Sequence, residues 1–287
     1  MRQGDLVVRN SYGGDVLFRV EALRSEYAIL KGTDYRLLAD SPLDDLSIVD
    51  DPESTPVVQK VRIKVNESWQ RMQRDRQKQV SNSEQPGARP SAHQAPYFEV
   101  PGKVLHLDGD GNYLKKSMQL YNTMSVPAYG LHLHESQMAN MLFRLLPQVR
   151  PDIVVITGHD GVLKLRSPNT MFSLGSYKNS QNFVNAVRVA REYEKSRDGL
   201  IVVAGACQSH FEALMDAGSN FASSPGRILI HALDPVYVAI KASYTPIRDT
   251  INLPEVIHGT ISGIDGVGGI ETLGRFRVGL PKSKATS

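Results

Sequence analysis

Cysteine is almost missing from this sequence, because Cys207 is the only one among 287 residues. A single cysteine excludes a disulfide framework within the chain and suits a reducing compartment. Long hydrophobic runs are missing too. No apolar stretch approaches the roughly 20 residues that a membrane-spanning helix needs, and the first residues lack the apolar core of a secretory signal. We therefore expect a cytoplasmic protein that does not interact with a membrane.

An excess of charge of one sign is also nearly absent. Lysine and arginine together number 33 against 30 acidic residues, which gives a formal net charge of +3. So small an excess does not by itself indicate a nucleic-acid partner. The hydrophobic content of 41% and the charged content of 22% are ordinary for a globular protein. The chain is long enough for one sizeable domain and a smaller one.

Residues 1–50 predict a small all-β domain. Five short strand-like stretches alternate with turns, at residues 5–9, 15–23, 27–31, 35–39 and 46–50. Short strands in such quick succession favour an SH3-like barrel. Barrels of this kind commonly bind partners, but this one displays no recognisable chemistry of its own.

Residues 51–95 predict a linker between two domains. Apolar residues recur there at three- and four-residue spacing, as on one face of a basic helix: Val58, Val61, Val65, Trp69 and Met72. A polar stretch rich in Pro, Gly and Ser follows at residues 81–96, and we expect it to be flexible. Aromatic residues are not interleaved with the basic ones, so nucleic-acid binding is not expected.

Residues 96–287 alternate strand-like and helix-like stretches. Apolar strands that end in polar residues are predicted at residues 103–110, 127–135, 152–160 and 200–207, each followed by a helical pattern. This alternation indicates an α/β domain with a mostly parallel central sheet covered on both faces. Ligands of such sheets bind beyond the carboxyl ends of the strands. Reactive side chains should therefore gather at that edge.

His159 and Cys207 are the leading candidates for chemistry at this edge, since each ends an apolar strand. A thiol with a pKa near 8.5 is mostly protonated at neutral pH, and a neighbouring imidazole can accept its proton. The peptide N–H groups of Cys207 and Asp160 could stabilise an oxyanion. Spacing alone leaves open a buried structural cysteine beside an unrelated histidine. His210 is a second candidate base, and His231 is interpreted as structural.

Several long motifs then resemble one known family, the YabG family of sporulation-specific proteases. They occur in matching order along the chain: PGKVLHLDGD at 101–110, PDIVVITGHD at 151–160, AGACQSHFEAL at 204–214, IHALDPVYVA at 230–239 and GVGGIETLGR at 266–275. The resemblance implies a caspase-like three-layer domain with Cys207 as nucleophile and His159 as base, and it implies no cofactor. It also implies substrates among coat and cortex-associated proteins, processed in the mother cell of spore-forming Firmicutes. Asp160 departs from the wider caspase-like pattern, which usually has glycine directly after the histidine.

Specificity for arginine is the next expectation. Asp108, Asp110 and Asp160 follow strands at the predicted site, and a carboxylate in a partly closed pocket favours a guanidinium. The YabG resemblance suggests the same preference. The alternative is that Asp108 and Asp110 cap the following helix. Cleavage after arginine would extend to the exposed linker, so we predict self-cleavage at one or more of four residues: Arg71, Arg74, Arg76 and Arg89.

Two other functions compete with the peptidase. Asp108 and Asp110 match the D-x-D motif of haloacid-dehalogenase-like phosphatases, but the acidic magnesium ligands of those enzymes are missing after the fourth strand. A non-enzymatic spore coat scaffold is the other alternative. Metal ligands are suggested by the residue types at His132, His134 and Glu135. No complementary cluster of His, Cys and Asp occurs elsewhere in the sequence, so no metal site is expected.

Overall fold

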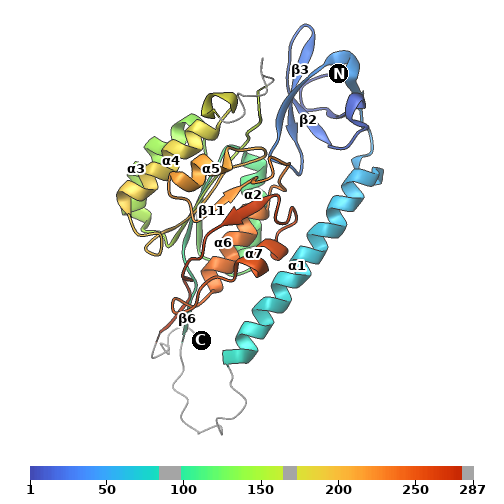
Figure 1. The fold of residues 1–287 in the computed structure, drawn as a ribbon. Coiled ribbons are helices and arrows are strands. Elements are labelled where there is room, and N and C mark those ends of the chain that lie inside the picture. The colour runs from blue at the N-terminus through green and yellow to red at the C-terminus, as the bar shows by residue number, and fades with distance from the viewer. Residues whose placement is uncertain (84–97, 164–172, 280–287) are drawn as a thin grey trace.

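The structure is a computed structural model that describes residues 1–83, 98–163 and 173–279. An antiparallel sheet at the N-terminus lies beside a larger α/β domain, and a long helix runs from that sheet along the α/β domain (Figure 1). The stretch expected to be flexible lies outside the described residues from position 84 onward. Within the described residues no helix is long and apolar enough to cross a membrane.

The N-terminal sheet has five strands in the order β4-β3-β2-β1-β5, all antiparallel. They are β1 (Leu6–Arg9), β2 (Phe18–Leu23), β3 (Tyr27–Gly32), β4 (Leu38–Pro42) and β5 (Leu46–Ile48). The expected closed barrel does not form, because among the described residues no pairing joins the edge strands β4 and β5. The position of one strand also differs from the prediction, which placed it at residues 35–39. β4 begins only at Leu38, since residues 35–37 pair outside this sheet.

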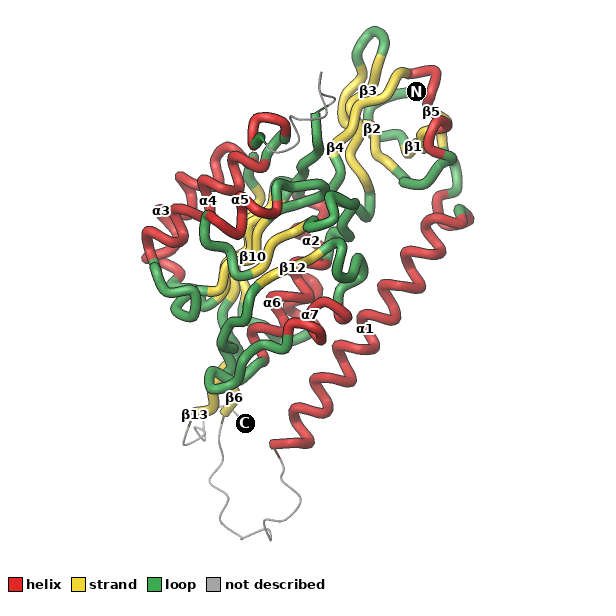
Figure 2. The backbone as a smooth tube through the Cα atoms, in the orientation of Figure 1, coloured by secondary structure: helices red, strands yellow, loops and turns green. Residues whose placement is uncertain are grey.

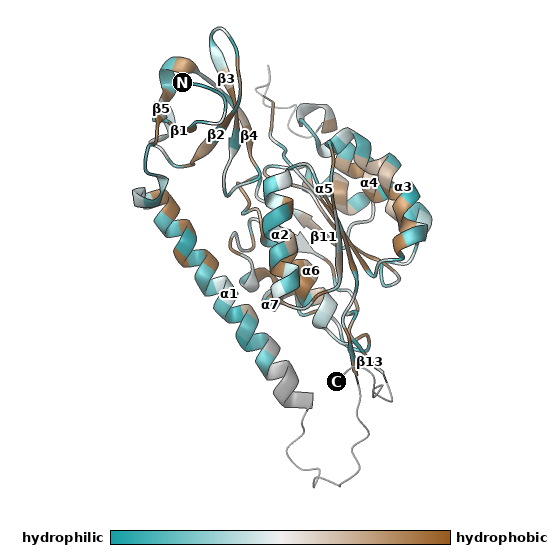
Figure 3. Cartoon of the chain, turned by 180° about the vertical axis from the view of Figure 1, so that it is seen from behind, coloured by the Kyte–Doolittle hydropathy of each residue, from teal (hydrophilic) through white to brown (hydrophobic). Residues whose placement is uncertain are grey.

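Helix α1 (Pro56–Ser83) confirms the helical periodicity of the basic segment. Val58 and Val61 are buried, and Trp69 and Met72 pack against the core of the α/β domain. The rest of its surface is largely hydrophilic (Figure 3). α1 therefore lies against the domain along one narrow apolar stripe.

The larger sheet has the order β12-β11-β10-β9-β7-β8, and all its neighbours are parallel except β11 and β12. Its strands are β7 (Val104–Asp108), β8 (Ala128–His132), β9 (Ile153–Thr157), β10 (Ile201–Ala204), β11 (Phe221–Ser223) and β12 (Val267–Gly269). β6 (Phe98–Val100) and β13 (Arg277–Gly279) form a separate antiparallel pair. The four parallel strands predicted from the apolar runs are confirmed. Their order places β9 beside β10.

Helices cover both faces of this sheet (Figures 1 and 2). One layer is α3 (Met138–Val149), α4 (Ser180–Tyr193) and α5 (Phe211–Asp216); the other is α2 (Gly111–Thr123), α6 (Asp234–Tyr244) and α7 (Leu253–Gly259). Alternate strand residues serve the two layers, since Leu105 and Leu107 pack with α3 and α4 whereas Val104 packs with α6. The sheet is thus covered by helices on both faces. Side chains that could take part in chemistry must therefore lie beyond the strand ends.

Candidate active site

Cys207 and His159 lie at the carboxyl ends of two neighbouring strands. β9 and β10 pair in parallel register, with Ala204 opposite Ile156, and the two residues follow within three positions of those strand ends. The sequence left open whether these two strands are neighbours, and the structure shows that they are. The side chains do not hydrogen-bond to each other, because both ring nitrogens of His159 are buried without a hydrogen-bond partner among the described residues.

A tight turn presents Cys207 after β10. Gly205 has φ 108°, which only glycine adopts without strain. Its carbonyl accepts a hydrogen bond of 2.8 Å from the Thr157 hydroxyl. The Ser209 hydroxyl accepts one of 2.9 Å from the N–H of Ala206. These bonds fix the turn that leads into the cysteine.

The thiol of Cys207 is fully buried and lies against Ile230. The Ile230 N–H donates to Sγ over 3.2 Å, and Sγ lies 3.5 Å from the Ile230 carbonyl oxygen. Burial raises the pKa of this thiol far above its ordinary value. In this state the cysteine is a neutral thiol.

His159 is held through its backbone and by an aromatic neighbour. Its N–H donates 2.9 Å to a carboxylate oxygen of Glu135, and its carbonyl accepts 2.8 Å from the Asn179 side chain. The Tyr113 ring lies with its centroid 5.4 Å from that of the imidazole. Burial lowers the pKa of His159 to about 4, although the nearby charge of Asp110, 3.8 Å from Nε2, acts in the opposite direction. The imidazole is therefore neutral at neutral pH, which is the protonation state that a general base needs.

Asp108 is the carboxylate that holds a guanidinium. It is fully buried, and its two oxygens lie 2.9 and 3.0 Å from Nη1 and Nη2 of Arg36. His106 Nε2 lies 3.3 Å from the same carboxylate. Burial alone would raise the pKa of Asp108, but the Arg36 charge and the His106 hydrogen bond hold it well below its ordinary value. This pair is the bidentate geometry that arginine recognition requires.

The other two predicted pocket carboxylates have different contacts. Asp110 caps α2, where it accepts 2.8 and 3.0 Å bonds from the N–H groups of Asn112 and Tyr113. Asp160 accepts hydrogen bonds from its own surroundings: the N–H groups of Gly161 and Asn179 and the hydroxyls of Ser180 and Ser209. Neither carboxylate contacts an arginine side chain within the part of the chain that the structure describes. Asp108 is thus the best candidate for an arginine pocket.

Residues 34–38 of the N-terminal domain lie at this same edge. Asp34 and Arg36 hydrogen-bond to the backbone of residues 230–232, and Arg36 and Leu38 bond to the backbone of Asp160. The hydroxyl of Tyr113 donates to the carbonyls of Gly32 and Tyr35, the latter over 2.8 Å. No motif in the sequence pointed to Arg36 or Tyr113 as site residues. Arg36 stood in a strand-like stretch, so no local pattern distinguished it.

The remaining histidine and acidic candidates have local roles. His134 Nδ1 lies 2.9 Å from the Ser136 hydroxyl, and His132 is exposed at the end of β8. Glu135 turns inward to the His159 N–H. His210 caps α5, and His231 Nδ1 accepts from the Leu233 N–H. No group of three or more potential metal ligands occurs among the described residues.

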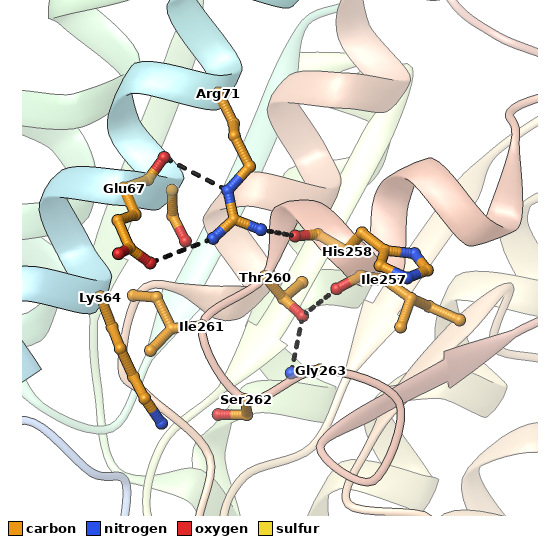
Figure 4. Close-up of a pocket in the computed structure, with 10 residues that line it drawn as sticks. Lys64, Glu67, Arg71, Ile257, His258, Thr260, Ile261, Ser262 and Gly263 are labelled. Atoms are coloured by element: carbon orange, nitrogen blue, oxygen red, sulfur yellow. Dashed lines mark hydrogen bonds and ion pairs between the residues drawn. The ribbon is translucent and has the colours of Figure 1, made fainter.

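The four linker arginines fall on or beyond α1. Arg71 and Arg74 lie within the helix, Arg76 does too, and Arg89 is outside the described residues. Arg71 donates 2.8 Å to the His258 carbonyl at a cavity of about 270 Å³ between α1 and the segment 257–263 (Figure 4). None of the residues lining this cavity is a candidate catalytic residue. This cavity lies where α1 packs on the α/β domain and is not the candidate active site.

Comparisons with known proteins show the family to which this chain belongs. The sequence model of a peptidase family, YabG peptidase U57, matches residues 2–281. The sporulation-specific protease YabG of Bacillus subtilis (strain 168) is 44% identical over 283 residues, which make up 97% of this chain and 97% of that protein. The similarity therefore includes the N-terminal sheet, α1 and the α/β domain together.

Proposed function

Because the chain belongs to the YabG peptidase U57 family and is therefore a peptidase, we propose that it is a cysteine endopeptidase. Cys207 is its nucleophile and His159 its general base. The observation that carries the proposal is their placement after the adjacent parallel strands β9 and β10. Cys207 is also the only thiol in the chain. The same order of strands supports a caspase-like architecture for the α/β domain, residues 96–287.

The mechanism assigns a step to each group. His159 accepts the thiol proton as Sγ attacks the scissile carbonyl carbon, and the imidazolium then protonates the departing amine. Water hydrolyses the resulting thioester, with His159 again as base. The peptide N–H groups of Cys207 and Asp160 stabilise the oxyanion. The Asp160 N–H already donates 3.4 Å to a carbonyl, that of Arg36.

Specificity for arginine is the second part of the proposal. Asp108 forms the base of the pocket, and its pair with Arg36 supports this because it demonstrates a guanidinium fitting there. Asp110 stands 3.8 Å from His159 Nε2 and can orient the imidazole. The phosphatase alternative loses support because the chain belongs to a peptidase family.

The biological setting follows from the name of the relative, a sporulation-specific protease. We propose that the substrates are coat and cortex-associated spore proteins, cleaved in the cytoplasm of the mother cell. Self-cleavage at the linker arginines remains part of this proposal, with residues 1–50 as the released domain. Arg71, Arg74 and Arg76 lie in a helix, so cleavage there needs local unfolding. Arg89 lies outside the described residues.

The test uses peptides that differ only in having Arg, Lys, Asp or Ala before the scissile bond. Wild type is expected to cleave the arginyl peptide, whereas Cys207→Ala and His159→Ala should lose at least a thousandfold in kcat/KM. His258→Ala is the matched control, because this exposed histidine lies in α7. Activity that survives in Cys207→Ala would refute the thiol mechanism and leave the scaffold alternative or another nucleophile.

A further inference from the structure

Residues 34–38 form an extended segment that leaves the N-terminal sheet and enters the catalytic edge. On one side the Ala232 N–H donates 2.8 Å to the Asp34 carbonyl, and the Arg36 N–H donates 3.3 Å to the Ile230 carbonyl. This is an antiparallel pairing centred on Tyr35 and His231. Extended peptides that bind proteins by strand addition use the same main-chain bonds.

The opposite side of the segment is bonded to the turn that carries His159. The Asp160 N–H donates 3.4 Å to the Arg36 carbonyl, and the Leu38 N–H lies 3.5 Å from the Asp160 carbonyl. The segment is therefore held between the loop that joins β11 to α6, whose Ile230 contacts the Cys207 thiol, and the loop after β9. Those two loops are the walls between which a substrate backbone would lie in the proposed peptidase.

The Arg36 side chain fills a closed pocket. It is fully buried, pairs with both oxygens of Asp108, and donates from Nε and Nη2 to the Ala232 carbonyl over 3.0 and 2.8 Å. The guanidinium carbon also lies 5.0 Å from the centre of the Tyr113 ring. Burying an arginine is costly unless its charge and donors are matched. Here a carboxylate, a carbonyl and an aromatic face match them.

Arg36 and the Cys207 thiol share a neighbour, the Ile230 carbonyl. The Arg36 N–H and Cys207 Sγ both lie within hydrogen-bonding reach of the Ile230 carbonyl, at 3.3 and 3.5 Å. Leu37 belongs to the same buried apolar cluster as Cys207 and Ile230. In the described part of the chain the Cys207 N–H donates no hydrogen bond, so it can join Asp160 in holding the Arg36 carbonyl oxygen.

We propose that Arg36–Leu37 is a self-cleavage site and that residues 34–38 are the first substrate of this chain's own active site. The inference rests on the proposed peptidase function. Sγ bonds to the carbonyl carbon of Arg36, the bond to the Leu37 nitrogen breaks, and that nitrogen takes the proton held by His159. Water then adds to the thioester, which frees the Arg36 carboxylate and returns the thiol. The products are residues 1–36 and 37–287.

Cleavage also opens the site to other substrates. Before it, Cys207 is fully buried in a cluster that includes Leu37, and Arg36 occupies the Asp108 pocket, so no other arginyl peptide can enter. After it, Leu37 carries a charged amino group inside an apolar cluster. A charge without a partner in such surroundings is strongly unfavourable, so the new terminus leaves the cluster. The segment thus keeps the peptidase inactive until one intramolecular turnover has occurred.

The experiment follows the purified full chain over time, with new termini read by mass spectrometry and an arginyl peptide assayed in parallel. Wild type should yield a terminus at Leu37 at a first-order rate that does not change on tenfold dilution. Arg36→Gln should lose this terminus at least a hundredfold, and Cys207→Ala should lose it entirely. Arg24→Gln is the matched control, because Arg24 is an exposed arginine in the connection between β2 and β3 and its loss should leave the Leu37 terminus unchanged.

Wild type that hydrolyses the peptide without producing the Leu37 terminus would overturn the self-cleavage site alone. Wild type that cleaves neither the peptide nor itself would overturn the proposed function. A rate that rises in proportion to protein concentration would refute intramolecular cleavage. None of these readouts depends on the folding of the Arg36 variant, because each is made on wild type.

Discussion

Asp108 illustrates how one residue can have two interpretations in the sequence that only contacts separate. It follows an apolar strand and precedes a helix, so a helix cap and a binding carboxylate were both open. The cap is Asp110, whereas Asp108 is bonded to Arg36 and His106. Three positions that look alike in the sequence thus divide into a cap, a guanidinium partner and, in Asp160, an acceptor for four surrounding donors.

Replacement of Asp108 by asparagine tests the arginine pocket. Asp108→Asn removes the charge that pairs with a guanidinium, so kcat/KM for an arginyl peptide should fall at least thirtyfold, or about 2 kcal/mol, with a much smaller loss for an alanyl peptide. Asp249→Asn, which alters an exposed aspartate, should retain wild-type values. Equal losses on the arginyl and alanyl peptides would contradict a specificity role. Steady-state kinetics on the two peptides provide the measurement.

Elements differ in how far their own residues specify them. The four parallel strands were predicted because buried strands of a covered sheet are continuously apolar. β4 was misplaced because residues 35–39 favour an extended backbone in either location. Residues 35–37 differ from β4 in their hydrogen-bonding partners. They pair with the backbone of residues 230–232 and of Asp160, some 120 to 200 positions away.

The turn after β10 provides a test at this scale. Gly205→Ala forces a side chain onto φ 108° and places its Cβ 2.9 Å from Leu214 Cδ1. We expect the free energy of unfolding to fall by about 1–3 kcal/mol, and peptidase activity to fall further because Cys207 moves. Gly259→Ala is the matched control, since nothing lies within 4 Å of its added Cβ. Urea unfolding gives the first quantity, and a Gly205→Ala protein of wild-type activity would contradict the turn's role.

At the scale of the whole molecule, the α/β domain buries several titratable side chains, some of them where the N-terminal residues 34–38 contact it. Burial lowers the pKa of His159 to about 4 and of His231 to about 3, and it lowers that of His106. Burial also raises the pKa of Asp234 to about 6 and raises that of Asp160. The histidines are neutral in the folded chain, whereas the unfolded chain protonates them below about pH 6.5.

These buried side chains should make stability depend on pH. Between pH 6.5 and 4 the unfolded chain binds up to three more protons on these histidines, while the folded chain binds up to two more on Asp234 and Asp160. The net effect is that the free energy of unfolding falls as the pH falls, by about 1.4 kcal/mol per pH unit for each proton of difference. Urea unfolding of Cys207→Ala, which stays uncleaved, measures it at pH 7, 6 and 5. Stability that rises on acidification would contradict the burial of the histidines.

The sequence by itself determined the α/β class, the parallel strands, and the placement of His159 and Cys207 at one edge. Each follows from short-range patterns: apolar runs, helical spacing, and the rule that parallel strands end at the same edge. Tertiary structure alone decided that the N-terminal strands form an open sheet, that Asp108 rather than Asp160 holds a guanidinium, and that this guanidinium belongs to Arg36. Those outcomes depend on pairings between residues far apart in the chain, such as Arg36 with Asp108. A local sequence pattern does not specify which distant backbone segment or charged side chain will contact it in the folded chain.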